Sequence, residues 1–313
     1  MNLRDLKYII AVAETRHFGR AAERCFVSQP TLSGQIKKLE DELGVAIFER
    51  TNRSVEITPV GAQIIAHARQ MMEQADAIEQ LAQAHQDPLA GPLRVGAIPT
   101  LSPYLMPLIL MPLKKQHPQM KLVLSEELTD TLLKRLHNHE IDVALLATSV
   151  DEADLQTVPL FDEPFWVAYP RKHAFYTKEK ITLRDLDNEN LLLLAEGHCL
   201  ADQAMDVCHI KERSEQGEMA DLRAASLETL IQLVRAGFGI TLLPALAMRG
   251  SWATGSGVVA QPLFIANATR RVSLVYRQSF PRKAALDALA QVILANLPNT
   301  VHPVNSRKTR RKH

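Results

Sequence analysis

Residues 93–300 alternate short apolar strands with helical segments, and this alternation restricts the possible folds more than any other feature of the chain. The strand-like runs are nearly continuous in apolar residues, which is typical of strands covered on both faces. The pattern predicts a parallel α/β sheet. The expected strands are residues 93–98, 121–125, 142–146, 165–169, 191–194, 240–243 and 272–276, and the expected helices are residues 103–116, 130–138, 227–235 and 283–297.

Two α/β lobes are the simplest arrangement of these elements, with the chain crossing between them near Glu163 and Asn267. The first lobe would hold about 91–163 and 268–300, and the second about 164–267. A cleft between such lobes holds ligands near strand C-termini and helix N-termini. Gly237-Phe238-Gly239 is expected to form the turn between a helix and a strand and is not a nucleotide-binding fingerprint.

Residues 1–58 carry a different pattern, that of a helix, a short helix, a third helix and a hairpin. Ser28 is a good N-cap, and Pro30 suits the first turn of the third helix, which Gly44 ends. The outward face of this helix carries small polar and basic groups that could reach base edges and phosphates in a major groove. A three-helix bundle with a solvated polar face is the alternative.

A linker helix is expected over 59–90, opened by Thr58-Pro59 and ended at Asp87-Pro88. Apolar residues alternate along it in steps of four and three, which predicts a coiled-coil seam with a second copy of the chain. The alternative is packing against the chain's own core. The expected seam residues are Ile64, Ala68, Met71, Ala75, Ile78 and Ala82.

Composition and termini favour a cytoplasmic protein that makes no use of a membrane. Arg4 and Asp5 stand where a secretory signal would need apolar residues, and no uncharged apolar run of about 18 residues occurs. The formal net charge is +1, so bulk charge does not indicate nucleic-acid binding. Residues 301–313 form a basic tail that we expect to be disordered.

The chain has three cysteines, and two of them, Cys199 and Cys208, each stand beside a histidine. Four interpretations compete: a zinc site with His198 and His209, a dithiol enzyme, inert core cysteines, and a thiol switch that senses peroxide. The wide spacing disfavours zinc, and a dithiol enzyme would favour closer cysteines. Cys25 is expected to be a small buried residue.

A thiol switch makes specific demands on this segment. Cys199 would need a lowered pKa and access to solvent, and His198 and a helix starting at Cys199 could supply positive potential. If the residues up to Cys208 are helical, they span about 13 Å, whereas a disulfide needs Cα atoms within about 7 Å. A disulfide would therefore require this segment to be remodelled.

The N-terminal residues resemble the winged helix-turn-helix of LysR-type transcriptional regulators. The resemblance rests on Ala21-Ala22, Val27 to Ser33, Ile36 to Glu40, Leu43-Gly44-Val45 and Phe48 to Thr51. It implies that the third helix lies in the groove and that the hairpin touches the DNA backbone. The expected DNA-binding residues are Ser28, Gln29, Pro30, Thr31, Ser33, Lys37, Arg50 and Arg53.

The remainder, up to about residue 300, is similar to the hydrogen-peroxide sensors of that family. The similarity rests on Leu160 to Pro164, Glu196 to Leu200, Asp202 to Met205, Cys208, Ser226 to Leu230 and Gly239 to Leu246. By resemblance, Cys199 is the peroxidatic thiol and Cys208 the resolving thiol. Thr100, Thr129, His198, Asp202 and Arg270 would line the peroxide pocket, although neighbouring Arg271 leaves the register of the arginine open.

We therefore expect a DNA-binding regulator of oxidative-stress genes, with a winged helix-turn-helix, a linker helix and a two-lobed α/β effector domain. It would not be an enzyme and would need no cofactor or metal. The expected partners are operator DNA, hydrogen peroxide as the signal, a second or further copies of the chain as a homodimer or homotetramer, RNA polymerase, and a thiol reductant such as glutaredoxin. The alternative is a LysR-type regulator that binds a small metabolite in the cleft.

Overall fold

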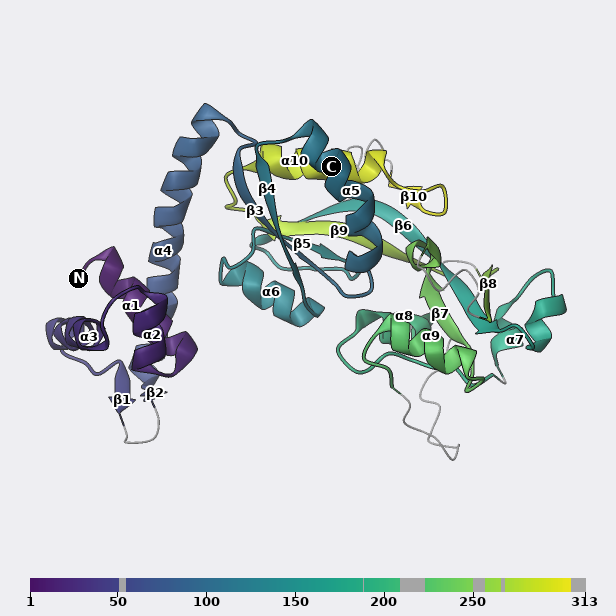
Figure 1. Cartoon of the computed structure of the whole chain (residues 1–313), viewed down its shortest axis with the longest axis horizontal. Coiled ribbons are helices and arrows are strands. Elements are labelled where there is room, and N and C mark those ends of the chain that lie inside the picture. Colours follow the sequence, from purple (N-terminus) through teal and green to yellow (C-terminus); the bar gives the residue numbers. More distant parts are fainter. Residues whose placement is uncertain (51–54, 188, 209–222, 250–256, 266–267, 305–313) are drawn as a thin grey trace. The chain divides into compact units, whose positions relative to one another are not determined.

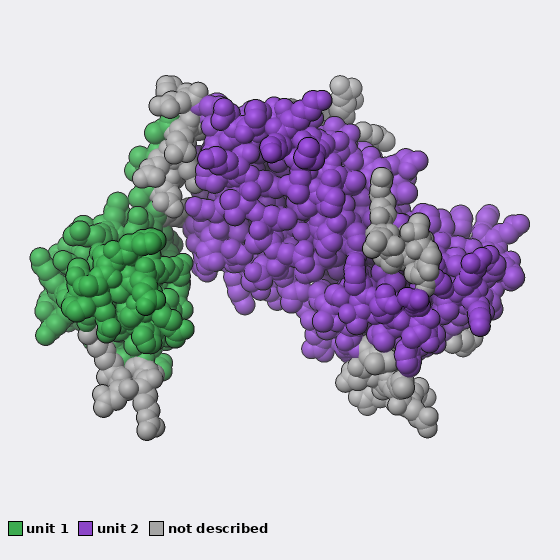
Figure 2. All heavy atoms as spheres, viewed as in Figure 1, with its two compact units in different colours: residues 1–86 green, residues 87–313 purple. Residues whose placement is uncertain are grey.

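The computed structural model describes residues 1–50, 55–187, 189–208, 223–249, 257–265 and 268–304 (Figure 1). The chain divides into two compact units, residues 1–86 and residues 87–313, which Figure 2 distinguishes by colour. None of the helices in the described residues combines the length and the apolar character that crossing a bilayer requires.

The first unit has the helix-turn-helix and hairpin that the sequence predicts. Its elements are α1 (Leu3–Thr15), α2 (Phe18–Arg24), α3 (Gln29–Leu43), β1 (Phe48–Arg50), β2 (Val55–Ile57) and α4 (Pro59–Gln86). The Ser28 side chain accepts a hydrogen bond from the Thr31 backbone N–H, and Gly44 ends α3 in the left-handed region at φ 70°. Ile36 and Leu39 are buried in the core of the unit. The predicted start and end of this helix are therefore confirmed.

The turn between α2 and α3 is a Schellman motif, in which the backbone N–H groups of Phe26 and Val27 bond to the carbonyls of Glu23 and Ala22. Phe26 takes the left-handed position at φ 55°, which glycine normally fills. A side chain in this conformation costs about 1–2 kcal/mol. Val27 packs against the core, whereas the Phe26 side chain is 95% exposed.

The long helix α4 has a buried part and an exposed part. Ile65 and Ala68 are buried in the core of the first unit. Ala68 therefore packs against the chain's own core, which was the alternative to a place in the coiled-coil seam. Further along the helix, Met71 and Ile78 are 46% and 69% exposed. The apolar residues available to a second copy of the chain therefore lie in the later turns of α4.

The second unit is a mixed α/β domain. Its elements are β3 (Gly91–Ala97), α5 (Ser102–Gln116), β4 (Met120–Glu126), α6 (Thr129–His137), β5 (Val143–Leu146), β6 (Leu155–Pro170), η1 (Ala174–Thr177), α7 (Leu183–Leu186), α8 (Cys199–Val207), α9 (Leu227–Arg235), β7 (Thr241–Pro244), η2 (Ala245–Arg249), β8 (Val258–Pro262), β9 (Thr269–Arg277), α10 (Lys283–Ala295) and β10 (His302–Pro303).

The expectation of a parallel sheet is wrong for most of the strand pairs. β3 is parallel to β4 and β5, but β9 runs antiparallel to β5 and β6, and β7, β8 and β10 run antiparallel to β6. A continuous run of apolar residues indicates that a strand is covered on both faces, but it does not indicate whether the strand runs parallel or antiparallel to its neighbours. Residues 191–194 were also expected to form a strand, but they form only isolated bridges, from Leu191 to Ile240 and from Leu194 to Ala224.

The long strand β6 belongs to both lobes (Figure 1). Its residues Leu155 to Pro164 pair with β9, and Phe165 to Pro170 pair with β7 and β8. The first lobe is built around β3, β4 and β5, and the second around β7, β8, α8 and α9. The chain leaves the first lobe beside Glu163, and the return crossing expected near Asn267 lies outside the described residues.

Candidate functional site

The helix α8 carries Cys199 in its first position and ends at Cys208, its C-cap. The helix start expected at Cys199 is therefore confirmed. Leu200, Ala201 and Ala204 are buried and hold α8 against the second lobe. Gly197 precedes the helix at φ 89°, and a Cβ there would lie 3.1 Å from the Leu128 side chain. Only glycine suits both this conformation and this approach.

A narrow hollow lies at the Cys199 end of α8. It lies where the C-terminal end of β3 meets the N-termini of α6 and α8, as ligand sites in α/β domains do. In this conformation it has no room for a water-sized molecule, so admitting a ligand requires side chains to shift. The lining residues are Ile98, Pro99, Thr100, Leu128, Thr129, Gly197, His198 and Cys199.

A buried ion pair between Arg270 and Glu163 is joined to the hollow through Thr100, one of its lining residues. Arg270 Nε donates to Glu163 Oε2 at 2.9 Å, and both side chains are fully buried. The other guanidinium nitrogens of Arg270 donate to Thr100, at 2.8 Å to Oγ1 and 3.0 Å to the carbonyl oxygen. The second oxygen of Glu163 accepts from the backbone N–H of Leu246 at 2.7 Å. These bonds compensate for much of the cost of burying both charges.

The arginine that faces the site is Arg270. Its neighbour Arg271 lies on the opposite face of β9, is exposed, and makes a two-pronged bond to Asp162 at 2.8 and 2.9 Å. Adjacent residues of a strand point to opposite faces, so only one of the two could reach Thr100.

The pKa of the Cys199 thiol is raised above its ordinary value, chiefly because the sulfur is buried. The Arg270 guanidinium and the Thr129 hydroxyl both act to lower this pKa, and Asp202 acts to raise it. The lowered pKa expected from the sequence is therefore wrong for this conformation. Positive charge does act on the sulfur, but desolvation outweighs it.

The side chain of Thr129 places a hydroxyl group in the lining of the hollow. Its hydroxyl is near enough to the Cys199 sulfur for a hydrogen bond to the thiolate to lower the thiol pKa, and it has no other hydrogen-bond partner among the described residues. A hydroxyl oxygen has two lone pairs as well as its proton, so a buried hydroxyl whose only neighbour is a thiol keeps hydrogen-bonding capacity for a ligand or water. Thr129 can therefore offer a bond to a small polar molecule beside the sulfur.

His198 and Asp202 take positions that the sequence did not reveal. Burial lowers the pKa of His198 below its ordinary value, so the imidazole is neutral at pH 7 and cannot supply the positive potential expected of it. Asp202 is exposed on α8 and does not belong to the lining of the hollow. Thr100, Thr129 and His198 do line it, and Arg270 contacts it through Thr100.

All three cysteines are thiols in this structure, and Cys199 and Cys208 lie in different environments. Cys199 packs against the core of the first lobe, whereas Cys208 is buried in the core of the second. Nine helical steps turn through about two and a half turns and rise about 13 Å, so the two side chains point to opposite sides of α8. A bond between them requires α8 to unwind, because disulfide Cα atoms lie within about 7 Å.

One side chain fastens α8 to the first lobe between these two cysteines. Gln203 Nε2 donates to the backbone oxygen of Ala147, just beyond β5, at 2.6 Å. Unwinding α8 would move this amide away from its acceptor. Sequence reasoning missed the roles of Gln203 and Glu163, although a charged residue within the apolar run that ends at Tyr169 was an available signal for the latter.

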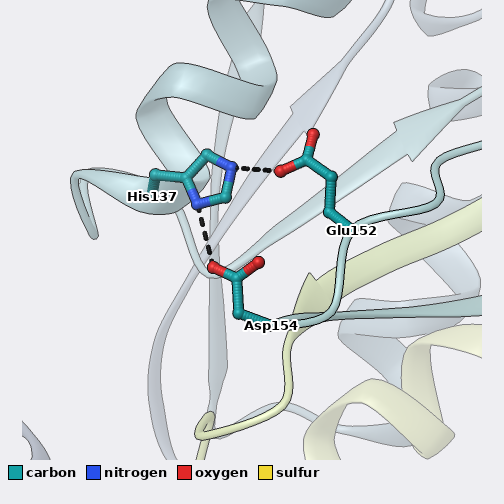
Figure 3. Close-up of side chains that lie close together, drawn as sticks. All are labelled: His137, Glu152 and Asp154. Carbon is teal, nitrogen blue, oxygen red and sulfur yellow. Dashed lines mark hydrogen bonds and ion pairs between the residues drawn. The ribbon is translucent and has the colours of Figure 1, made fainter.

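Neither candidate for a metal centre has the geometry of a preformed site. The separation of Cys199 and Cys208 prevents one zinc ion from binding both thiols, and His209 lies outside the described residues. A second cluster joins His137 to Glu152 and Asp154 (Figure 3). Its carboxylates contact different ring nitrogens, at 2.7 Å to Nε2 and 3.1 Å to Nδ1. A metal ion could replace only one of these contacts.

The expected DNA-binding residues lie mostly on the surface of the first unit. Ser28, Gln29, Pro30 and Thr31 are exposed at the N-terminus of α3, Lys37 is exposed two turns later, and Ser33 is half-buried. The side chain of Arg50 and the whole of Arg53 lie outside the described part of the chain. Cys25 is half-buried and packs against the core of the unit, near its expected place.

Two families match the chain and together span most of its length. The bacterial regulatory helix-turn-helix protein, lysR family, matches residues 3–62, and the LysR substrate binding domain matches residues 86–298. The DNA-binding transcriptional dual regulator OxyR of Escherichia coli is 42% identical over 297 residues, covering 95% of this chain and 96% of that protein. The hydrogen peroxide-inducible genes activator of Pectobacterium carotovorum is 42% identical over 293 residues, covering 94% and 96%.

Solved structures agree with these relationships. A full-length OxyR variant from Pseudomonas aeruginosa superimposes with a TM-score of 0.78 and 41% identity, covering 97% of this chain and 98% of that one. A cysteine variant of OxyR from Corynebacterium glutamicum, with hydrogen peroxide bound, gives a TM-score of 0.63 and 34% identity, covering 94% and 92%.

Proposed function

This chain belongs to the OxyR group of the LysR family of bacterial transcriptional regulators, and we propose that hydrogen peroxide switches it through Cys199 and Cys208. It regulates oxidative-stress genes by binding their operators, with oxidation as the signal. The observation that carries the proposal is the pairing of a thiol at a hollow that also holds two threonine hydroxyls with a second thiol at the far end of the same helix.

The chemistry proceeds in two balanced steps. The Cys199 thiolate attacks one oxygen of hydrogen peroxide, which gives a sulfenic acid and releases hydroxide that becomes water. The Cys208 thiol then displaces water from the sulfenic acid and forms the disulfide. Thr129 and Thr100 orient the peroxide, and the Arg270 charge stabilises negative charge as it develops. A thiol reductant such as glutaredoxin returns both cysteines to thiols.

The structural consequence follows from the position of α8. The disulfide cannot form while α8 is helical, so oxidation removes both the packing of Cys199 on the first lobe and the Gln203 bond to Ala147. A covalent event of this kind biases an element between two arrangements. Each oxidation consumes one peroxide and stops until a reductant restores the two thiols, so the disulfide records the exposure of the chain to peroxide.

The first unit supplies DNA recognition. The exposed residues at the start of α3 face the bases, and Lys37, Arg50 and Arg53 face the phosphates. Two copies joined along α4 read two half-sites, and a tetramer extends the contact along the promoter. The activated regulator recruits RNA polymerase, and the chain works in the cytoplasm.

The test is to treat the purified chain with one equivalent of hydrogen peroxide and to map disulfides by peptide mass spectrometry. A Cys25→Ser background removes the third cysteine, and we expect one intramolecular Cys199–Cys208 peptide. The matched Cys208→Ser variant should instead trap a sulfenic acid on Cys199. Thiols that stay reduced would contradict the proposal and would favour a regulator that binds a small metabolite.

A further inference from the structure

Phe26 is the most exposed large apolar side chain in the described part of the molecule, at 95%. It also occupies a left-handed backbone position, at φ 55°, where glycine or asparagine would be relaxed. The left-handed backbone conformation does not favour a phenylalanine at this position, and the exposed ring does not contribute to packing within the folded chain. Residues kept in strained conformations are concentrated at functional sites.

The place of Phe26 in the fold indicates what its side chain meets. It stands two residues before Ser28, the N-cap of α3. Ser28 and the first three residues of α3, 29–31, are exposed as well. In a helix-turn-helix, the N-terminal residues of the second helix contact base edges. The turn carries Phe26 beside that end of α3, and its two backbone hydrogen bonds and the buried contact of Val27 hold it in place.

The surroundings of Phe26 favour DNA over a protein partner. Between residues 20 and 38 no other large apolar side chain is strongly exposed, so no apolar patch of the kind that protein partners bury surrounds the ring. The charged residues in this stretch are Arg20, Glu23, Arg24, Lys37 and Lys38, which together carry four positive charges and one negative charge. A single aromatic ring among polar and basic groups suits the major groove.

We propose that Phe26 is a specificity-determining residue whose ring packs against a thymine methyl group at the edge of each operator half-site. The thymine 5-methyl group is the apolar feature of the major groove, and phenylalanine is one of the side chains that contact it. The fixed turn presents the ring with little loss of freedom on binding. This inference rests on the DNA binding assigned to α3 in the proposed function.

The experiment uses the full-length chain in its reduced form. A random-sequence duplex library is selected with the wild-type chain, and the selected duplex is made again with deoxyuridine in place of thymidine. Affinity for both duplexes is then measured for wild type, Phe26→Asn and Phe26→Tyr. Leu43→Asn serves as the control, because it removes a 39% exposed apolar side chain at the opposite end of α3.

We expect the wild type to lose about fourfold in affinity for each contacted methyl group that is removed. Phe26→Asn should bind the thymidine duplex about tenfold more weakly and should not respond to deoxyuridine. Phe26→Tyr should keep most of the response, and Leu43→Asn should behave as the wild type does. Phe26→Asn should also melt a few degrees higher, because asparagine tolerates the left-handed position. Its weaker binding would then not result from misfolding.

Other outcomes overturn the inference in distinguishable ways. Equal affinity of wild type and Phe26→Asn for both duplexes would remove Phe26 from the DNA contact. If transcription with purified RNA polymerase then fell in that variant, the ring would serve a protein contact instead. Additive losses from the variant and from deoxyuridine would show that the ring and the methyl group do not meet. Failure of the wild type to select any sequence would overturn the proposed DNA binding itself.

Discussion

At the sulfur of Cys199, burial and positive charge act on the thiol pKa in opposite directions. Burial is the larger effect and raises the pKa, while Arg270 and Thr129 reduce the rise. The resting thiol is therefore mostly protonated at pH 7, so its reactivity depends on a small thiolate fraction and on how well the site stabilises the transition state.

The raised pKa predicts a steep pH dependence of Cys199 alkylation. Below its pKa the thiolate fraction grows tenfold per pH unit, so the iodoacetamide rate should rise about tenfold per unit between pH 6 and 8. The rate is measured in a Cys25→Ser, Cys208→Ser background. A rate that levels off near pH 6 would mean that the pKa is depressed. Because the folded-state pKa lies above the unfolded value of about 8.5, the thiol stabilises the fold below that pH and loses this effect as pH rises through the folded pKa.

Replacing Thr129 with valine tests the hydroxyl that lies beside the Cys199 sulfur. Thr129→Val keeps the shape and removes a group that lowers the Cys199 pKa, so the alkylation profile should move to higher pH. Oxidation by peroxide should slow by about tenfold or more, since a bond to the oxidant is also lost. The matched change Thr148→Val removes another buried hydroxyl that has no hydrogen-bond partner within the described part of the chain and does not line the hollow, so it should leave both rates unchanged. Equal slowing in both variants would contradict a specific role for Thr129.

At the scale of elements, α8 connects the redox chemistry to the two lobes. Its first residue packs on one lobe, its C-cap is buried in the other, and Gln203 bonds across to Ala147. These contacts stabilise the helical form and therefore oppose the disulfide. The reduction potential of the pair consequently depends on residues that take no part in the sulfur chemistry.

Gln203→Ala should make the disulfide easier to form. Losing one hydrogen bond from the reduced form alone costs about 1 kcal/mol, which corresponds to a reduction potential lower by about 20 mV. The potential is measured by titration against glutathione, with exposed Asp206→Ala on the same helix as the control. An unchanged potential in Gln203→Ala would show that the bond to Ala147 survives oxidation.

For the assembled regulator that we propose, operator recognition depends on how copies of the chain associate. The early turns of α4 pack on the core of the first unit, and the later turns leave Met71 and Ile78 exposed. Exposed apolar residues at heptad-like spacing on a long helix favour a coiled coil. A seam of this kind would set the distance between the two copies of α3.

Ile78→Asp should weaken self-association, because it places a charge in the proposed seam. Operator affinity should fall by more than tenfold, since two half-sites are then read by separate molecules. Sedimentation velocity gives the association state, and fluorescence anisotropy gives the affinity. Val60→Asp, at a 40% exposed position outside the seam, is the control. A variant that remains as associated as the wild type would exclude Ile78 from the interface.

Elements whose signals are local can be predicted from the amino-acid sequence alone. Ser28 and Pro30 mark the start of α3, Gly44 marks its end, and Cys199 begins α8, all as predicted. These features depend on caps, backbone conformation and spacing within one turn, so neighbouring residues suffice to encode them. The placement of two cysteines beside histidines marks Cys199 and Cys208 in the sequence, and the resemblance to LysR-type regulators adds Thr100 and Thr129, which line the hollow.

Strand direction, the partners of the buried charges and the pKa values of Cys199 and His198 depend on how distant segments pack. β9 enters antiparallel between β5 and β6, and this pairing turns Arg270 toward Glu163 and Thr100 and turns Arg271 outward. Burial, which depends on residues distant in sequence, raises the Cys199 pKa and keeps His198 neutral at pH 7. Desolvation and strand pairing are set by packing among distant segments, and one-dimensional patterns do not contain them.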